Sequence, residues 1–130
     1  MKALSIHQPW AWAILHAGKN VENRSRRTTH RGPLLVHASK SRASYDAHDP
    51  EKWLERYGVA LPAWEELVKG AIVGQVEVVD CVPVEQLSSV AWASGPWCWV
   101  LQNPRALAEP VEWKGQQSLY QVPDEMLRAR

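Results

Sequence analysis

The chain has 130 residues, a formal net charge of +1, 45% hydrophobic and 22% charged residues, which are ordinary values for a single globular domain with its own core. It has no apolar run near the ~20 residues of a membrane-spanning helix and no signal-peptide pattern, so we expect a cytoplasmic protein that does not enter membranes. In that reducing compartment Cys81 and Cys98 are expected to be buried free thiols.

Two features of the composition are unusual. Residues 1–45 carry a net charge of +7, whereas residues 46–130 carry −6. A basic segment of this kind suits a polyanion, most commonly nucleic acid. The chain also contains eight Trp and no Phe. Because a buried Trp needs a partner for its N–H group, we expect some of these side chains to do more than fill the core.

The first predicted elements are a strand over 2–6 and a helix that begins at Pro9 and ends at Gly18. Proline fits the first helical position, where its missing N–H is not needed, and glycine fits the position after a helix. A 3.6-residue period predicts one core-facing stripe on this helix. Its members are Trp10, Ala13, Ile14 and Ala17.

A basic turn and a central strand follow this helix. The chain is predicted to be extended from residue 20, so that Val21 faces the core while Glu22 and Arg24 lie side by side on the other face. Residues 25–31 are predicted to form a loop, and residues 33–39 a strand buried on both faces. His37 shares a face with Leu35 on that strand, where a histidine bonded within the core and a ligand-binding histidine are both open readings.

Residues 40–70 are predicted to be a helical insertion, with one helix from Asp49-Pro50-Glu51 to Gly58 and a second over 62–69. The strand over 71–82 follows. Strict alternation places Ile72, Val76, Val78 and Val82 on one face of it, and Val73, Val79 and Cys81 on the other. Gly74 is expected to mark a bend or bulge.

The rest of the chain is predicted to contain further short elements. These are a turn or helix over 83–90, a strand from Trp97 that ends at Asn103-Pro104, short strands over 109–113 and 118–122, and a helix over 123–130. The pattern predicts a single α+β domain over residues 1–130, a small, mixed and partly open β-barrel of five to six strands with peripheral helices.

Several common site motifs are absent from the sequence. It contains no phosphate-binding or dinucleotide glycine loop, no GxSxG motif and no zinc-ligand spacing, since Cys81 and Cys98 are 17 residues apart without paired histidines. We therefore expect neither a metal nor a nucleotide cofactor.

Five stretches together resemble the ASCH domain of the PUA-like superfamily: ALSIHQPWAWAI, GKNVENRS, RGPLLVHASK, GAIVGQVEVVDC and WVLQNPRALAEPVEWKGQQSLYQV. The ASCH hallmark is a G-x-K-x-x-E-x-R signature after the first helix, and Lys19, Glu22 and Arg24 match its last three residues. The glycine differs, because Gly18 directly precedes Lys19, which suggests a shorter turn. The Gln8-Pro9-Trp10 triplet is most similar to the QPW-type branch.

This resemblance implies a PUA-like β-barrel with a ligand cleft at the signature and a nucleic-acid or nucleoside ligand, generally RNA. One bacterial ASCH branch hydrolyses N4-acetylcytidine with the signature Lys, a Thr and a later Glu. Here the Thr position holds Glu22, which conflicts with a Thr nucleophile. No residue clearly matches the later Glu, for which Glu77 and Glu85 are the candidates. Another ASCH protein is a metal-independent ribonuclease that relies on the signature Lys.

Three functions follow as alternatives: a binding module for RNA or a modified nucleoside, a small metal-independent hydrolase acting on N4-acylated cytidine or RNA, and a protein-interaction module without chemistry. In the hydrolase, Lys19 would polarise an oxygen, Glu22 would act as a base and Arg24 would stabilise negative charge. We expect a monomer. The residues assigned to ligand binding are Gln8, Pro9, Trp10, Arg26, Arg27, His37, Ser39, Lys40 and Trp97.

Overall fold

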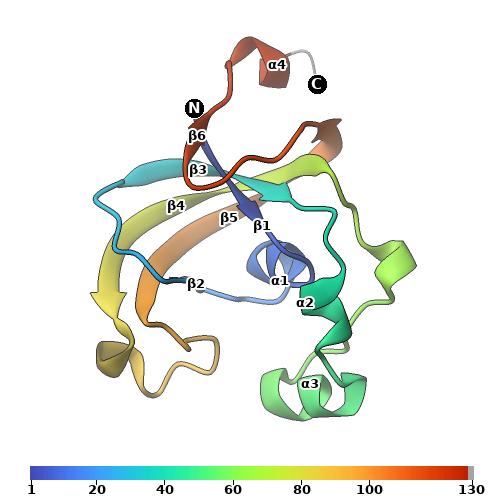
Figure 1. Ribbon diagram of the computed structural model, residues 1–130, viewed down its shortest axis with the longest axis vertical. Helices are drawn as coiled ribbons and strands as arrows, with labels where there is room; N and C mark the ends of the chain where they lie inside the picture. Colours follow the sequence, from blue (N-terminus) through green and yellow to red (C-terminus); the bar gives the residue numbers. More distant parts are fainter. Residues whose placement is uncertain (129–130) are drawn as a thin grey trace.

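Six strands form one curved sheet in the order β2-β5-β4-β3-β1-β6 in the computed structural model, which describes residues 1–128 (Figure 1). The strands are β1 (Lys2–Ile6), β2 (Val21–Arg24), β3 (Gly32–Ala38), β4 (Ala71–Pro83), β5 (Trp97–Glu112) and β6 (Tyr120–Gln121). The helices are α1 (Trp10–His16), α2 (Ala43–Asp46), α3 (Pro50–Tyr57) and α4 (Glu125–Arg128), with single 3-10 turns η1 (Trp64–Glu66) and η2 (Val84–Leu87). The predicted C-terminal helix extends to residues 129–130, which lie outside the described part.

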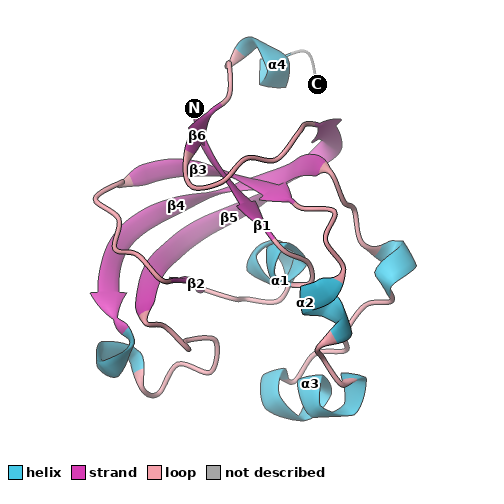
Figure 2. Cartoon of the chain, in the orientation of Figure 1, coloured by secondary structure: helices cyan, strands magenta, loops and turns pink. Residues whose placement is uncertain are grey.

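The sheet is mixed and curls without closing. β1 and β3 are parallel and every other neighbouring pair is antiparallel. Within residues 1–128 the two edge strands β2 and β6 do not pair with each other. The helices and connecting loops lie around and within this curved sheet (Figure 2). The predicted α+β class and partly open barrel of five to six strands are therefore confirmed.

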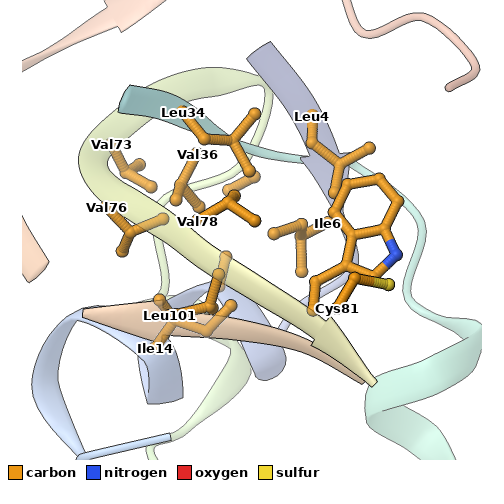
Figure 3. Close-up of a cluster of buried hydrophobic side chains, with 13 residues drawn as sticks. Leu4, Ile6, Ile14, Leu34, Val36, Val73, Val76, Val78, Cys81 and Leu101 are labelled. Carbon is orange, nitrogen blue, oxygen red and sulfur yellow. The ribbon is translucent and has the colours of Figure 1, made fainter. Parts of the chain in front are cut away.

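The main core lies between α1 and the concave face of the sheet (Figure 3). Ala11 and Ile14 of α1 are buried there against Leu4, Val36 and Leu101 from three different strands. A second, smaller buried cluster lies on the opposite face of the sheet, around Ala3, Leu35, Ile72, Val111, Tyr120 and Val122. Because β3 contributes to both clusters, it is a central strand, as its two apolar faces predict.

The predicted faces of β4 were wrong, because the strand is bulged. Its pairing with β5 shifts register at three places, between Ile72 and Gly74, between Gln75 and Glu77, and between Val78 and Asp80. Each shift interrupts the two-residue alternation of side chains. As a result Val73 and Cys81 join the main core, and Ile72 lies on the opposite face. Gly74 does mark a bulge, and a Cβ there would lie 2.6 Å from the backbone oxygen of Arg105.

Two predicted boundaries were also wrong. The Asn103-Pro104 pair does not end a strand, and β5 continues unbroken from Trp97 to Glu112. Neither residue is in the pairing register with β4, and Asn103 adopts a left-handed φ of 54°. The pair forms a bulge at which the missing N–H of proline breaks no ladder bond. In the insertion, residues 62–69 form only the single turn η1 rather than a helix.

Helix α3 has the boundaries that its end residues predict. The Asp49 side chain accepts a hydrogen bond of 2.9 Å from the Glu51 N–H, and Pro50 occupies the first turn. At the other end Gly58 adopts a φ of 73°, a left-handed conformation that favours glycine. Cys81 and Cys98 are buried free thiols, as predicted. In the described part of the chain, no helix has the length and apolar character needed to cross a membrane.

Candidate functional site

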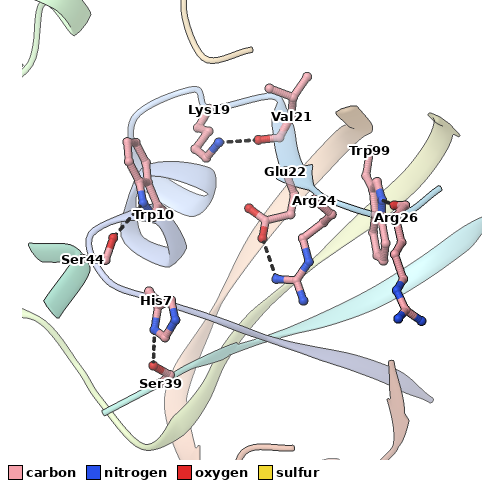
Figure 4. A network of polar contacts seen from close by, with 10 residues as sticks. All are labelled: His7, Trp10, Lys19, Val21, Glu22, Arg24, Arg26, Ser39, Ser44 and Trp99. Carbon is pink, nitrogen blue, oxygen red and sulfur yellow. Dashed lines mark hydrogen bonds and ion pairs between the residues drawn. The ribbon is translucent and has the colours of Figure 1, made fainter. Parts of the chain in front are cut away.

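Lys19 lies directly after α1 and turns inward (Figure 4). Gly18 has a φ of 77°, and the Lys19 N–H donates to the Ala13 carbonyl, so the chain reverses at the end of the helix. The Lys19 side chain is only 3% exposed, and its Nζ donates a 2.6 Å hydrogen bond to the Val21 carbonyl oxygen. A cation buried to this degree is rare without a dedicated environment.

Strand β2 places the other two signature side chains beside it. Val21 is buried in the core, and alternation along the strand turns Glu22 and Arg24 to the opposite side, as predicted. The Arg24 Nη1 donates to the Glu22 Oε2 at 3.2 Å. Glu22 is 6% exposed, whereas Arg24 is half-buried and reaches toward solvent. The three signature residues thus form one partly buried charged cluster.

Burial shifts both titratable groups of this cluster toward their neutral forms. Desolvation lowers the pKa of Lys19, an effect that the nearby Glu22 carboxylate partly offsets. Desolvation likewise raises the pKa of Glu22 above its usual range, against the opposing charges of Lys19 and Arg24. A lysine and a carboxyl group whose pKa values move toward each other can exchange a proton more easily than exposed groups.

The charged cluster opens into a cavity of about 350 Å³, called here the Lys19 pocket. Three aromatic side chains, Trp10, Tyr57 and Trp92, contribute to its wall. The Lys19 Nζ lies 5.1 Å from the Trp10 ring centroid and 6.0 Å from that of Trp92, within the range of cation–π attraction. The full lining is Ile6, His7, Trp10, Lys19, Glu22, Asn23, Arg24, Ser44, Arg56, Tyr57, Ala91, Trp92, Ser94 and Gly95.

The aromatic wall is held by contacts between distant segments. The Trp10 Nε1 donates to the Ser44 Oγ at 3.1 Å, which ties α1 to α2. The Tyr57 and Trp92 rings stack at 3.9 Å with an interplanar angle of 2°, which joins α3 to the loop before β5. Asn23 fixes that loop, because its Nδ2 donates to the Trp92 carbonyl oxygen and its Oδ1 accepts from the Gly95 N–H.

A second hollow, of about 870 Å³, adjoins the Lys19 pocket and is called here the arginine groove. Arg24, Arg26 and Arg27 line it, and His7 and Arg24 line both hollows. Arg26 and Arg27 are exposed in the loop after β2, as the sequence predicts. The guanidinium of Arg27 lies 5.9 Å from the ring of Trp97, which borders the basic loop but lies outside the Lys19 pocket.

Not every residue assigned from the sequence lies at the Lys19 pocket. Gln8 is buried and is not part of the lining of this pocket; its Nε2 donates to the Val68 carbonyl and its Oε1 accepts from the Trp12 N–H. Pro9 is buried at the start of α1. Both residues lie at the start of α1, the helix that carries Trp10.

His37, Ser39 and Lys40 line a third hollow, of about 700 Å³, called here the Lys40 pocket. The His37 Nε2 lies 2.7 Å from the Trp113 carbonyl oxygen, so this nitrogen is the donor, and Nδ1 therefore accepts from the Ser5 hydroxyl at 3.0 Å. The Ser5 Oγ also lies 3.1 Å from the Tyr120 hydroxyl. His37 thus has partners for both ring nitrogens. This agrees with the prediction of a histidine bonded within the core rather than one that binds a ligand.

Acidification from pH 7 to pH 5 is expected to lower the free energy of unfolding through His37. Burial lowers the pKa of His37, so its neutral form is favoured in the folded state, and this stabilisation is lost as the pH falls below the usual value near 6.5. Urea unfolding of the wild type and His37→Asn at pH 7, 6 and 5 measures the free energy of unfolding. The difference in this free energy between the two proteins should become smaller at low pH. A difference that does not change with pH would contradict the role of neutral His37 in the folded state.

Most residues that line the Lys19 pocket were missed by the sequence reasoning, among them His7, Ser44, Tyr57 and Trp92. The excess of Trp was a signal that could have pointed to Trp92, but nothing in the local sequence pairs it with Tyr57, 35 positions earlier. Glu77 and Glu85 do not line the Lys19 pocket. No group of three or more His, Cys, Asp or Glu side chains within residues 1–128 is placed to hold a metal ion.

Comparisons with known proteins agree with this architecture. The family model of the ASCH domain matches residues 4–114. The human and mouse proteins named Activating signal cointegrator 1 are each 27% identical to the chain over 128 residues, which cover 92% of the chain. The chain corresponds to only 22% of the length of these relatives.

Solved structures of an ASCH protein from Zymomonas mobilis have the same fold. One crystal structure has a TM-score of 0.60 at 15% identity, and covers 98% of this chain and 90% of that one. A crystal structure of a mutant of that protein has a TM-score of 0.61 at 13% identity, and covers 98% of this chain and 94% of that one. At these identities the likeness shows the fold alone.

Proposed function

Because the chain belongs to the ASCH domain family, we propose that its Lys19 pocket binds the base of RNA or of a modified nucleoside, while the arginine groove holds the adjoining phosphates. The observation that carries this proposal is the position of Lys19, Glu22 and Arg24 in a cavity with aromatic walls. The cavity volume of about 350 Å³ is at the lower end of the usual range for small-ligand pockets.

The two parts of the pocket suit the two properties of a nucleobase. Trp10 and Trp92 offer flat apolar surfaces, and stacking of a base on an aromatic ring contributes ~1–3 kcal/mol. Lys19 and Arg24 donate hydrogen bonds and Glu22 accepts them, so the polar edge of a base finds both kinds of partner. RNA readers commonly recognise single unstacked bases in this way.

The test is a fluorescence titration with nucleosides, N4-acylated cytidines and a short single-stranded RNA. Trp10 and Trp92 lie in the pocket wall, so a bound base is expected to quench tryptophan emission saturably. Trp10→Phe and Trp92→Phe should each remove part of the quenching. No quenching or calorimetric binding by any member of this panel would overturn the proposal.

Replacing Arg26 and Arg27 with glutamine is expected to weaken RNA binding and to flatten its salt dependence. For a single strand, the slope of log affinity against log salt falls by ~0.7 for each phosphate that the protein no longer neutralises. The matched control is Lys52→Gln plus Arg105→Gln, which removes the same charge from exposed positions outside the three hollows. An equal reduction of the slope in the control would mean that the two arginines act only through net charge.

A metal-independent hydrolase is the second candidate, favoured by the opposite pKa shifts of the buried Lys19 and Glu22. In this function Lys19 polarises a carbonyl or phosphoryl oxygen, Glu22 activates water and Arg24 stabilises the developing negative charge. Chromatography of N4-acylated cytidines and RNA incubated without metal tests it. Product formed by the wild type and not by Glu22→Gln supports the hydrolase, and binding without product supports the reader.

The burial of the tryptophans speaks against an interaction module without chemistry. None of the eight Trp side chains, all within residues 1–128, is fully exposed. Trp53 and Trp99 are buried, and the others are half-buried. Aromatic side chains that anchor a protein partner need an accessible surface. The half-buried Trp10 and Trp92 instead face a cavity of small-molecule size.

A further inference from the structure

The Lys40 pocket is the part of the surface that the proposed function leaves unexplained. Its volume of about 700 Å³ is about twice that of the Lys19 pocket. Lys40 and Lys114 line it and are both exposed, and Glu112 is the one acidic residue in its lining. Its buried histidine has both ring nitrogens bonded within the core, so the groups of the pocket best placed to meet a ligand are the two lysines.

The three hollows follow one another along the surface. His7 and Arg24 line both the Lys19 pocket and the arginine groove, and Ser39 lines both the arginine groove and the Lys40 pocket. The His7 Nδ1 and the Ser39 Oγ are hydrogen-bonded at 2.8 Å (Figure 4). A residue shared by the first two hollows is therefore in direct contact with the residue shared by the last two. Residues 114–115 line the Lys40 pocket and the next two residues line the groove. Together they form a path from Lys19 to Lys114.

The charges along this path are mainly positive. The arginine groove has three arginines in its lining and no acidic residue. At one end Glu22 is paired with Arg24, and at the other end two lysines outnumber Glu112. The cations are thus spread over all three hollows rather than gathered at one point. Cations arranged along such a path suit a polyanion, which can contact them in succession.

We propose that this path binds one single strand of nucleic acid, with a base in the Lys19 pocket, backbone in the arginine groove and a further phosphate between Lys40 and Lys114. The inference rests on the proposed function and narrows its ligand, because a free nucleoside would occupy the Lys19 pocket alone. The strand is single because a base must leave a duplex stack before it can enter a pocket. Lys40 and Lys114 then mark the far end of the site.

The test compares ligands of increasing length on two variants. Calorimetry or anisotropy measures a mononucleotide and single strands of three and six nucleotides of the same sequence, as RNA and as DNA. The wild type is expected to bind the six-nucleotide strand at least tenfold more tightly than the mononucleotide. The variant Lys40→Gln plus Lys114→Gln should bind the six-nucleotide strand at least threefold more weakly than the wild type does. Its affinity for the mononucleotide should be unchanged. The slope of its log affinity against log salt should fall by ~0.7, for the one phosphate that the two lysines hold together.

The control and the contrary outcomes separate this inference from the function on which it rests. Lys52→Gln plus Arg105→Gln has the same net charge and should bind both ligands nearly as the wild type does. Equal affinity of the wild type for the mononucleotide and the six-nucleotide strand would overturn the extended path while the Lys19 pocket stands. If the control variant also lost the tighter binding of the six-nucleotide strand, the role of Lys40 and Lys114 would be overturned. No binding of any ligand would overturn both proposals.

Discussion

Replacing Lys19 with alanine is expected to reduce nucleobase binding, or turnover if the protein is a hydrolase, by at least tenfold while the fold remains intact. Hydrogen bonds from a charged donor contribute ~1.5–3 kcal/mol, which corresponds to about 10- to 150-fold in affinity. The fold should tolerate the change because the Lys19 Nζ bonds one backbone carbonyl and sits beside a cavity. Fluorescence titration and thermal unfolding of the same sample measure the two effects.

Lys19→Met is the matched variant, since methionine keeps an unbranched side chain but removes the ammonium group with its charge and its hydrogen-bond donors. Equal losses in the two variants would assign the effect to the ammonium group. The pH dependence of ligand affinity is a second test of the role of the Lys19 ammonium group. Because burial lowers the pKa of Lys19, affinity should fall at a lower alkaline pH than a free lysine would give, and the methionine variant should not show this fall. Unchanged affinity in both variants would remove Lys19 from the site.

Replacing Trp53 with alanine is expected to destabilise the protein by about 3–5 kcal/mol, the usual range for a large buried aromatic residue. Trp53 is 2% exposed, and its ring lies 5.2 Å from that of Trp10, 4.7 Å from Tyr57 and 5.9 Å from Trp92. It therefore supports all three aromatic residues of the Lys19 pocket without lining it. Loss of this support should also weaken ligand binding, because the wall loses its fixed shape.

Trp53→Phe is the sharper half of this experiment. The Trp53 Nε1 is buried and has no hydrogen-bond partner within residues 1–128, so phenylalanine removes an unsatisfied donor together with part of the ring. We expect this variant to lose less than half as much stability as Trp53→Ala and to keep ligand affinity within about threefold. Chemical denaturation and titration at one temperature measure both. A phenylalanine variant as unstable as the alanine variant would show that the indole N–H has a partner.

The residues of the first 39 positions illustrate what short-range patterns can predict. Gly18 and the helix before it, the alternation of Val21, Glu22 and Arg24, and the two-sided burial of the strand with His37 all follow from neighbours in sequence. Helix α3 belongs to the same class, because Asp49 and Gly58 specify its two ends locally. The ASCH signature Lys19, Glu22 and Arg24 and the Gln8-Pro9-Trp10 triplet lie within the first 39 positions, so these local patterns helped to identify the family.

Strands β4 and β5 illustrate what such patterns cannot predict. The side on which Val73 and Cys81 lie depends on register shifts between two long strands, and a register is fixed only when both strands pair. Asn103-Pro104 resembles a strand end in isolation. In the sheet it is a bulge, because the pairing on either side of it stabilises the unusual backbone.

Short motifs were enough to predict the family, the charged signature Lys19, Glu22 and Arg24, and the basic loop after it, because each motif depends on residues a few positions apart. The folded chain was needed to find that Tyr57 and Trp92 complete the Lys19 pocket and that Lys40 lines a different hollow. These arrangements depend on contacts between segments tens of residues apart. Burial of apolar surface in the whole domain brings such segments together, and no local pattern encodes which of them will meet.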